Sequence, residues 1–321
     1  MLNSLRPLVA LAAFLPLSLS ICLGGCASNK TEIDKEQQLD LYATTAQYLY
    51  EDGKLVRAQD QAVKALAIDP DNIPMRRMIG WIRLRLGKNQ DLIIAEQFFR
   101  ELVRDGDDGN AALLGLATAH ERLGLAYDEN SRAEGISEDE RERRQAEARK
   151  RWQESRELYE RTLSKGEGDT RAMNGLQRVT ALLGDLPASL AWSERLLQRA
   201  EQNLAAWRRM LENQDLSTTD EDVIRSSETE AITLAVNTHL FAASLLNQLG
   251  RPKDAIAHLD AVLAHEPDMA QVYSRRAQLR ADLGEKAAAI RDIERYIRLS
   301  PHDLDHPDIQ AAFELRRGLG G

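Results

Sequence analysis

The sequence predicts an all-α protein, and two observations support this prediction. The first is composition: among the 321 residues, Gly (19) and Pro (9) are scarce and only 5% are aromatic. Ala, Leu, Glu, Arg and Gln dominate, and their side chains lose little conformational freedom in a helix. The second is a spacing of Gly, Ala and Pro that recurs along the chain. A recurring spacing of this kind is typical of an array of helical hairpins.

The charge balance bears on the possible partners. The net charge is −9 and the isoelectric point is about 5.3. An acidic chain of this kind lacks the positive surface that a phosphate backbone requires. We therefore expect no nucleic-acid partner.

The first 26 residues differ from the rest of the chain. Arg6 is the only charged side chain before Cys26, and residues 7–22 are almost wholly apolar. This run contains two prolines and is shorter than the ~20 residues that a membrane-spanning helix needs. A positive start, an apolar middle and small residues at the end are typical of an export signal.

The signal ends in Leu23-Gly24-Gly25-Cys26, which resembles the lipobox of bacterial lipoproteins. The resemblance implies cleavage between Gly25 and Cys26, removal of residues 1–25, and a diacylglycerol and further acylation on Cys26. Ala27 follows the cysteine instead of Asp, which in diderm bacteria implies the periplasmic face of the outer membrane. In a host with one membrane, the anchor would lie in the cell membrane. A plain signal peptide without lipid is the alternative.

Four later segments align with one another: "LYEDGKLVRAQDQAVKALAIDPDN", "RLRLGKNQDLIIAEQFFRELVRDGDD", "LNQLGRPKDAIAHLDAVLAHEPDM" and "LRADLGEKAAAIRDIERYIRLSPHD". In three of them an Ala follows a Gly by five residues, and a Pro follows that Ala by twelve. This pattern resembles the tetratricopeptide repeat (TPR), a helix-turn-helix unit of 34 residues. The resemblance implies a TPR solenoid, a right-handed superhelix of antiparallel helix pairs.

Each unit of this family has a turn glycine and two small residues where its helices approach. We expect the turn glycines at Gly53, Gly87, Gly124, Gly184, Gly250 and Gly284. The small residues of the second helices are Ala58, Ala95, Ser155, Ser189, Ala255 and Ala289. Those of the first helices are Ala46, Gly80, Ala117, Ala243 and Ala277, with Gln177 at the matching place of the fourth unit. About six units follow, at 39–72, 73–109, 110–169, 170–203, 236–269 and 270–303.

Two elongated helical segments interrupt the regular spacing. A charged insertion at about 126–150 splits the third unit, and Ser137 with Glu140 predicts a capped helix that runs to about Ser164. It is either a solvated helix extension or an arm that contacts a partner or the membrane surface. In the fourth unit, the second helix overruns to about Asn213, and the next one begins near Asp222.

In that fourth-unit overrun, Trp207, Met210 and Leu211 share one face. They either pack inside an oversized helix pair or form a hydrophobic docking edge. At the end of the chain, Asp305 is expected to cap a last helix that covers the exposed apolar face of the array. Ile309 and Phe313 should face inward from it.

These elements divide the chain into seven parts, which are described by their expected roles. They are a signal peptide (1–25), a short tether (26–30), units 1–2 (31–109), unit 3 with its insertion (110–169), unit 4 with extended helices (170–235), units 5–6 (236–303), and a capping helix with its tail (304–321).

The motifs of catalysis are missing from the sequence. We find no nucleophile elbow, phosphate-binding loop or His-Glu-x-x-His. The best metal candidate is "HDLDH", which holds His302, Asp303, Asp305 and His306. It lies between two prolines, which predict a turn instead of the helix that would bring both histidines to one face. We therefore predict no metal, no cofactor and no enzyme activity.

What remains is recognition of another protein. In the TPR family, the first helix of each unit lines a concave groove, and Arg and aromatic residues are common anchors at interfaces. Asn and Gln side chains can pair with the backbone of an extended peptide. The family's groove positions fall on Arg77, Trp81, Asn174, Arg178, Asn237, Phe241, Asn247 and Arg275, with Arg85, Arg171, Gln248, Gln271 and Gln278 beside them. The alternative is that these are ordinary surface residues.

The predicted function is a membrane-anchored scaffold that holds a protein partner of the cell envelope in this groove. TPR lipoproteins include pilotins of pilus secretins, parts of outer-membrane protein insertion and adaptors of peptidoglycan enzymes, and the resemblance is one of architecture. The alternative is a structural component of an exopolysaccharide or secretion export complex. That component would bind through its convex face or its charged arm.

Overall fold

The computed structural model describes residues 34–106, 109–166, 168–212 and 217–320, so Gly25 and Cys26 lie outside the described residues. Within these ranges the chain forms thirteen α-helices and no strand, which confirms the all-α prediction. The helices are α1 Lys35–Glu51, α2 Leu55–Ile68, α3 Ile73–Leu86, α4 Asn89–Arg104, α5 Asn110–Ser131, α6 Glu138–Lys165, α7 Thr170–Leu182, α8 Leu186–Leu211, α9 Thr218–Gln248, α10 Pro252–His265, α11 Ala270–Asp282, α12 Lys286–Leu299 and α13 Pro307–Gly318.

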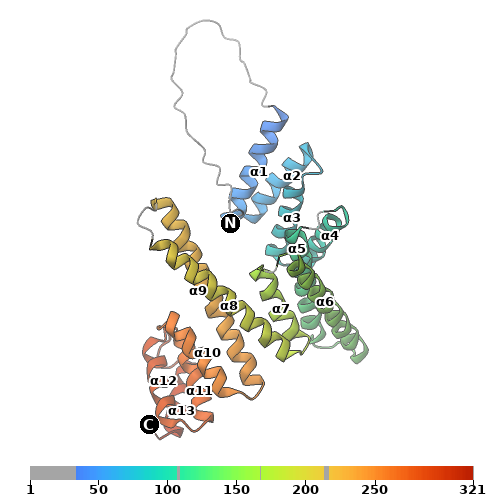
Figure 1. Cartoon of the computed structure of the whole chain (residues 1–321). Helices are drawn as coiled ribbons and strands as arrows, with labels where there is room; N and C mark the ends of the chain where they lie inside the picture. The colour runs from blue at the N-terminus through green and yellow to red at the C-terminus, as the bar shows by residue number, and fades with distance from the viewer. Residues whose placement is uncertain (1–33, 107–108, 167, 213–216, 321) are drawn as a thin grey trace.

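Consecutive helices contact each other along the whole array, which runs from α1 at one end to α13 at the other (Figure 1). Antiparallel pairs form from α1 and α2 through to α11 and α12, and α13 packs on the last pair. The first helices of neighbouring pairs also touch, at α1–α3, α3–α5 and α5–α7. From α1 to α7 the first helices therefore lie on the inner side of the curve, and the second helices lie on its outer side.

The small residues of the second helices lie where helices cross. All six, from Ala58 to Ala289, have no exposed surface. Gln177, the large residue at a small-residue position, is also buried. Its side-chain amide nitrogen donates to Ser193 Oγ at 2.9 Å, and its backbone carbonyl accepts from Ser189 Oγ at 2.6 Å. Ser193 thereby supplies a hydrogen-bond partner that the buried side-chain amide needs.

Glycines in the first helices make room for aromatic rings of the second helices. The ring of Phe99 in α4 lies between Gly80 in α3 and Gly115 in α5. A Cβ atom would lie 2.6 Å from that ring at Gly80 and 2.3 Å from it at Gly115. Tyr159 in α6 approaches Gly175 in the same way, and a Cβ atom at Gly175 would lie 2.2 Å from the Tyr159 ring. Glycine is required at these positions because any side chain would overlap the ring.

The prediction that Gly124 occupies a turn was wrong. Five of the six expected turn glycines have a left-handed φ between +69° and +86°, but Gly124 lies inside α5. The turn of this pair falls at Gly135, with a φ of +79°. A Cβ at Gly124 would lie 2.4 Å from the indole nitrogen of Trp152. This glycine therefore serves close packing, and α5 continues past it.

The elongated segments form two long hairpins, α5–α6 and α8–α9, which project from the array (Figure 1). As predicted, Ser137 caps α6, and its Oγ accepts from the Glu140 amide at 3.3 Å. Helix α9 begins at Thr218, four residues before the expected start at Asp222, because Ser217 caps it.

No helix among the described residues is both long enough and apolar enough to cross a membrane.

The apolar residues of the fourth-unit overrun lie along the α8–α9 hairpin. Trp207 and Leu211 are half-buried, and Met210 is 48% exposed. At the carboxyl end, α13 begins at Pro307 and its cap is His306, not Asp305. The reason is that Pro307 takes the first helical position, where its missing N–H costs nothing. Ile309 is fully buried in the last core cluster, and Phe313 packs against it.

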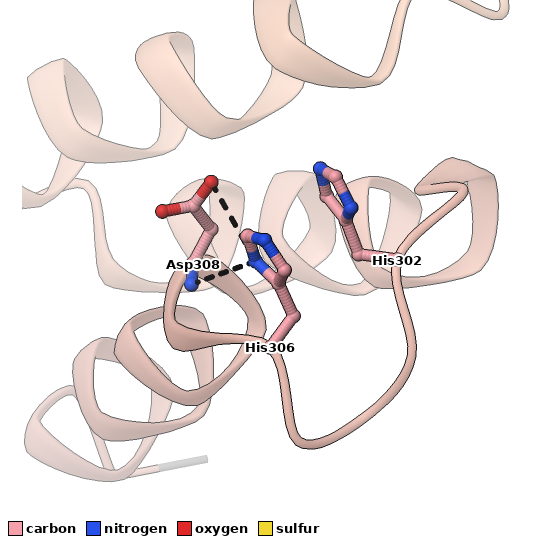
Figure 2. A group of neighbouring side chains, drawn as sticks. All are labelled: His302, His306 and Asp308. Carbon is pink, nitrogen blue, oxygen red and sulfur yellow. Dashed lines mark hydrogen bonds and ion pairs between the residues drawn. The ribbon is translucent and has the colours of Figure 1, made fainter.

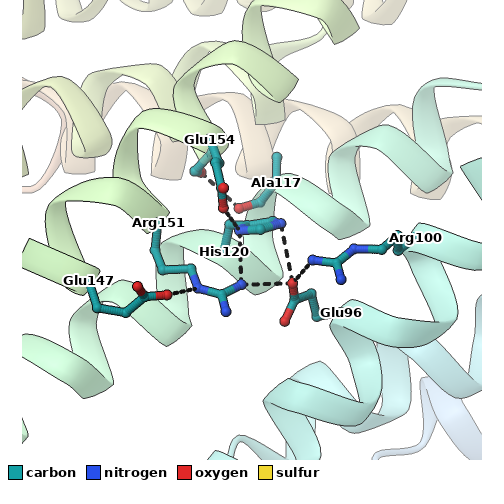
Figure 3. A network of polar contacts seen from close by, with 8 residues as sticks. Glu96, Arg100, Ala117, His120, Glu147, Arg151 and Glu154 are labelled. Atoms are coloured by element: carbon teal, nitrogen blue, oxygen red, sulfur yellow. Dashed lines mark hydrogen bonds and ion pairs between the residues drawn. The ribbon is translucent and has the colours of Figure 1, made fainter. Parts of the chain in front are cut away.

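A polar network joins the base of the α5–α6 hairpin to α4 (Figure 3). Glu96, which is 5% exposed, accepts from Arg151 at 2.7 Å, and Arg151 also donates to Glu147 at 2.9 Å. His120 lies 2.9 Å from Glu154 and 3.6 Å from Glu96. Burial lowers the pKa of His120, although both carboxylates oppose this effect. Three helices are thereby held together by charge as well as by apolar contact.

A second histidine site joins α9 to α10. The Nδ1 atoms of His239 and His258 lie 2.8 Å apart, so one ring donates a hydrogen bond and the other must be neutral to accept it. Burial, followed by the neighbouring charges of His258 and His265, lowers the pKa of His239 to about 4.

We expect Gly115→Ala to lower the free energy of unfolding by about 1–3 kcal/mol, the typical cost of overpacking a core. The added methyl group would overlap the ring of Phe99. Urea unfolding followed by circular dichroism measures this change. Gly318→Ala is the matched control, because no atom lies within 4 Å of a Cβ there. Adding Phe99→Leu to the Gly115→Ala chain should recover part of the loss. If Gly115→Ala costs as much in the presence of Phe99→Leu as in its absence, the packing argument is contradicted.

Acid should weaken the fold partly through His239. The pKa of this residue is about 4 in the folded chain, whereas the ordinary pKa of a histidine side chain is 6.5. Between these values the unfolded chain binds more protons, so the free energy of unfolding falls as the pH drops from about 6.5 to about 4. Because the ring is partly exposed, we expect a loss of roughly 1 kcal/mol. Urea unfolding at pH 7.5 and 4.5 should show a smaller difference for His239→Asn than for the unchanged chain, while His302→Asn should match the unchanged chain.

Candidate functional site

A cavity of about 330 Å³ opens on the concave side, between the first helices α5, α7 and α9. Apolar side chains from these helices and from the start of α8 make most of its wall, and four polar side chains complete it. The apolar residues are Leu125, Ala181, Leu182, Leu186, Phe241 and Leu245, and the polar ones are Glu121, Arg178, Ser244 and Gln248.

A buried carboxylate and an arginine form the polar wall of this concave cavity. Glu121 is 4% exposed and accepts two hydrogen bonds from Arg178, at 2.5 Å from Nε and 2.9 Å from Nη2. The Tyr159 hydroxyl donates to the same carboxylate at 2.7 Å. A two-point contact of this kind fixes the plane of the guanidinium.

The electrostatics of the three groups support one another. Burial alone would lower the pKa of Arg178, but the hydrogen bonds and charge of Glu121 outweigh it and raise this pKa. Burial and the nearby Glu121 carboxylate raise the pKa of Tyr159. The arginine therefore stays charged, and its two hydrogen bonds to Glu121 pair it with that residue.

The lining of the concave cavity is suited to binding. Its only ionisable side chains are Glu121 and Arg178, and they are paired with each other. Leu125 is 41% exposed at its edge, and Ser244 and Gln248 are exposed on α9. Such a site can take up an apolar side chain and offer an amide and a hydroxyl to the backbone beside it.

A second cavity, of about 440 Å³, lies at the carboxyl end between α11, α12 and α13. The exposed residues Gln271, Arg275 and Gln278 of α11 line it, facing Asp308 and Ala311 of α13. The array therefore has an apolar hollow near its middle and a more polar one at its carboxyl end.

The structure gathers only some of the predicted groove residues. Arg178, Phe241 and Gln248 meet in the concave cavity, and Arg275 lies in the carboxyl-terminal one. The others are spread along the array: Arg77 and Asn174 are half-buried, and Arg171, Asn237 and Asn247 are exposed.

Two of the predicted groove residues that lie outside both cavities make contacts within the fold. Trp81 is half-buried and packs edge-to-face on Phe99, with ring centroids 5.3 Å apart. Arg85 donates to the Tyr50 carbonyl at 2.8 Å and lies over the Tyr50 ring. Whether these residues bind a partner stays a prediction.

Sequence reasoning missed Glu121 and Leu125. The available signal was spacing, because Glu121 follows the small residue Ala117 by four positions and so shares its face of the helix. A carboxylate on a buried face needs a cationic partner.

The comparisons with known proteins agree with this architecture. The tetratricopeptide repeat family matches residues 242–303. Two Arabidopsis thaliana proteins, ethylene-overproduction protein 1 and ETO1-like protein 1, are 26% identical over 136 and 135 residues. These matches cover 42% and 41% of this chain, and only 14% and 15% of the relatives' own lengths.

Solved structures extend the likeness over most of the chain. Pseudomonas aeruginosa pilF is similar over 87% of this chain and 98% of its own, with a TM-score of 0.52 and 14% identity. A thermophilic TPR protein of Thermus thermophilus matches 77% of this chain and 98% of its own, with a TM-score of 0.46 and 17% identity. At such identities the likeness shows the fold alone. The described chain is a TPR solenoid, as its spacing predicted.

We expect Arg178→Met to lower the free energy of unfolding by about 2 kcal/mol. This is less than the 3–5 kcal/mol typical of a fully buried pair, because the Arg178 side chain is 40% exposed. The loss arises because Glu121 would remain buried without its main partner. The double variant Glu121→Gln/Arg178→Met should lose less than the sum of the two single variants in urea unfolding. Strict additivity would show that the pair makes no coupled contribution.

Proposed function

We propose that this chain is a membrane-anchored scaffold of the bacterial envelope that binds an extended segment of a partner protein along its concave side. The observation that carries the proposal is the cavity between α5, α7 and α9, whose walls are apolar and whose charged groups are paired with each other. The anchoring half of the proposal rests on the "LGGC" sequence at Cys26.

The size of the concave cavity suits a side chain more than a large cofactor. At about 330 Å³ it lies at the lower end of the range for small-molecule sites, which is about 300–1,000 Å³. Leu125, Leu182 and Phe241 can surround one large apolar side chain of the partner. The Arg178–Glu121 pair is already satisfied, so covering it leaves no unpaired charge.

The residues around the concave cavity suit a peptide backbone. Gln248 lines the cavity and Asn247 is exposed beside it. Their amides can each donate to a carbonyl and accept from an N–H of an extended chain. Farther along the array, the exposed Arg275 with Gln271 and Gln278 can offer polar contacts to the continuation of that segment. We infer a partner segment with one large apolar anchor residue, which the apolar lining of the concave cavity would surround.

A single crosslinking experiment in intact cells tests this function. The double variant Leu125→Glu/Phe241→Ala should reduce capture of the native partner at least tenfold, because it places an unpaired charge in the apolar cavity and removes its largest wall. Quantitative mass spectrometry of the crosslinked material measures the loss. Val223→Glu is the matched control, because Val223 is an exposed apolar residue of α9 outside the cavity. Arg178 is left unchanged, since its pairing with Glu121 belongs to the fold.

Two more variants separate the alternatives. Replacing residues 129–145 with a short turn shortens the α5–α6 hairpin and keeps Trp152 and the Glu96–Arg151 network. Capture should survive this change, whereas loss of capture here and not in the cavity variant would favour arm-mediated assembly in an export complex. Cys26→Ser should release the protein from the membrane fraction. Retention of that variant in the membrane fraction would contradict lipid anchoring.

A further inference from the structure

A group of three metal-binding side chains lies at the turn between α12 and α13 (Figure 2). His302 and His306 belong to the turn, and Asp308 belongs to the first turn of α13. A ring nitrogen of each histidine and a carboxylate oxygen of Asp308 all lie within 4.8 Å of one another. We propose that these three residues bind one divalent transition-metal ion, of which Zn²⁺ is the best match.

The side chains need only small movements to share an ion. His306 Nδ1 lies 3.8 Å from the Asp308 carboxylate, close to the ~3.3 Å that separates two ligands of a tetrahedral ion with bonds of ~2.0–2.1 Å. The two imidazole rings stack, with centroids 3.8 Å apart and planes at 8°. Each ring must tilt to aim a nitrogen at a common point. His302 is exposed and His306 is half-buried, so solvent leaves room for this tilt.

The hydrogen bonding prepares His306 for a metal. Its Nδ1 accepts from the Asp308 backbone amide at 3.3 Å, so the lone pair of Nδ1 already points toward the start of α13. A bond of 3.3 Å is long for an N–H donor. An ion at this atom would therefore replace a weak hydrogen bond with a coordinate bond.

The ligand set selects the kind of metal. Two imidazoles with one carboxylate suit Zn²⁺ and its neighbours among the transition metals. Ca²⁺ and Mg²⁺ prefer sites made wholly of oxygen. Three protein ligands leave a fourth position of the tetrahedron for water.

The spacing of the sequence alone does not identify this site. Two histidines four residues apart usually share an ion from one face of a helix. Here Pro301 and Pro307 prevent a helix, yet the turn brings the rings together. Among the described residues, the acid of the cluster is Asp308, not Asp303 or Asp305.

The position of the site gives the ion a mechanical role. His302 lies in the turn shortly after α12 and Asp308 lies in the first turn of α13, so an ion between them joins the end of α12 to the start of α13. Helix α13 inserts the fully buried Ile309 into a core cluster with Ile293 and Tyr296. Fixing its first turn should hold the cap on the last unit of the array.

Titration calorimetry of the chain from residue 27 onward with ZnCl₂ tests the proposal. This chain contains every described helix and no cysteine that could compete for the metal. We expect one ion per chain and at least a tenfold loss of affinity in each of three variants: His302→Ala, His306→Asn and Asp308→Asn. Asn at position 306 still caps α13, so a loss there reports a lost ligand and not a lost cap. Asp305→Asn is the matched control and should bind like the unchanged chain.

Thermal unfolding gives a second readout. Saturating Zn²⁺ should raise the unfolding midpoint of the unchanged chain by roughly 2–4 °C and leave that of His302→Ala unchanged. The absence of saturable binding would overturn the proposal. So would binding that persists when His302 and His306 are both replaced, or binding that is lost in His258→Asn, which would place the ion at the other histidine pair.

Discussion

Close approach between helices at residues with little or no side chain is the constraint on which this structure depends. Phe99 fills the space above two glycines, and Tyr159 fills the space above a third. Each ring contacts helices of two successive units, so the same residues close a hairpin and join it to the next one. Because packed interiors tolerate little overlap, the position of each glycine sets the distance and angle at which neighbouring pairs stack. The curvature of the array, and hence its concave side, follows from these contacts.

The concave cavity arises next to the two long hairpins. Helices α5, α7 and α9 each carry side chains to it, and two of them belong to the hairpins that exceed the usual length of a unit. The buried pair of Glu121 and Arg178 connects α5 to α7 at the wall of the cavity. A buried ion pair adds little to stability compared with an apolar contact. Its value here is geometric, because it fixes one wall and leaves the charges of the site satisfied before a partner arrives.

Much of the fold could be predicted from local sequence signals. The composition, the repeating Gly–Ala–Pro spacing and the cap at Ser137 each concern residues that are neighbours along the chain, and their energies are decided within one or two turns of helix. The errors share another cause. Gly124 has the spacing of a turn glycine, but the indole of Trp152, which comes 28 positions later, required its missing side chain. Asp305 is a good capping residue in isolation, yet Pro307 moved the start of the helix by one position.

The candidate site likewise has features that local sequence signals predicted and features that only contacts between helices decided. The sequence by itself determined that the chain is an acidic array of helical pairs, because its composition and its Gly–Ala–Pro spacing concern residues that are neighbours along the chain. Only the tertiary structure decided that Phe241 and Arg178 share a cavity, that Trp81 packs on Phe99, and that His302 and His306 meet across a turn. These outcomes depend on contacts between residues of different helices or across a turn, and on the angle at which those elements pack. That angle is set by the combined shape of many side chains, which no single spacing in the sequence contains.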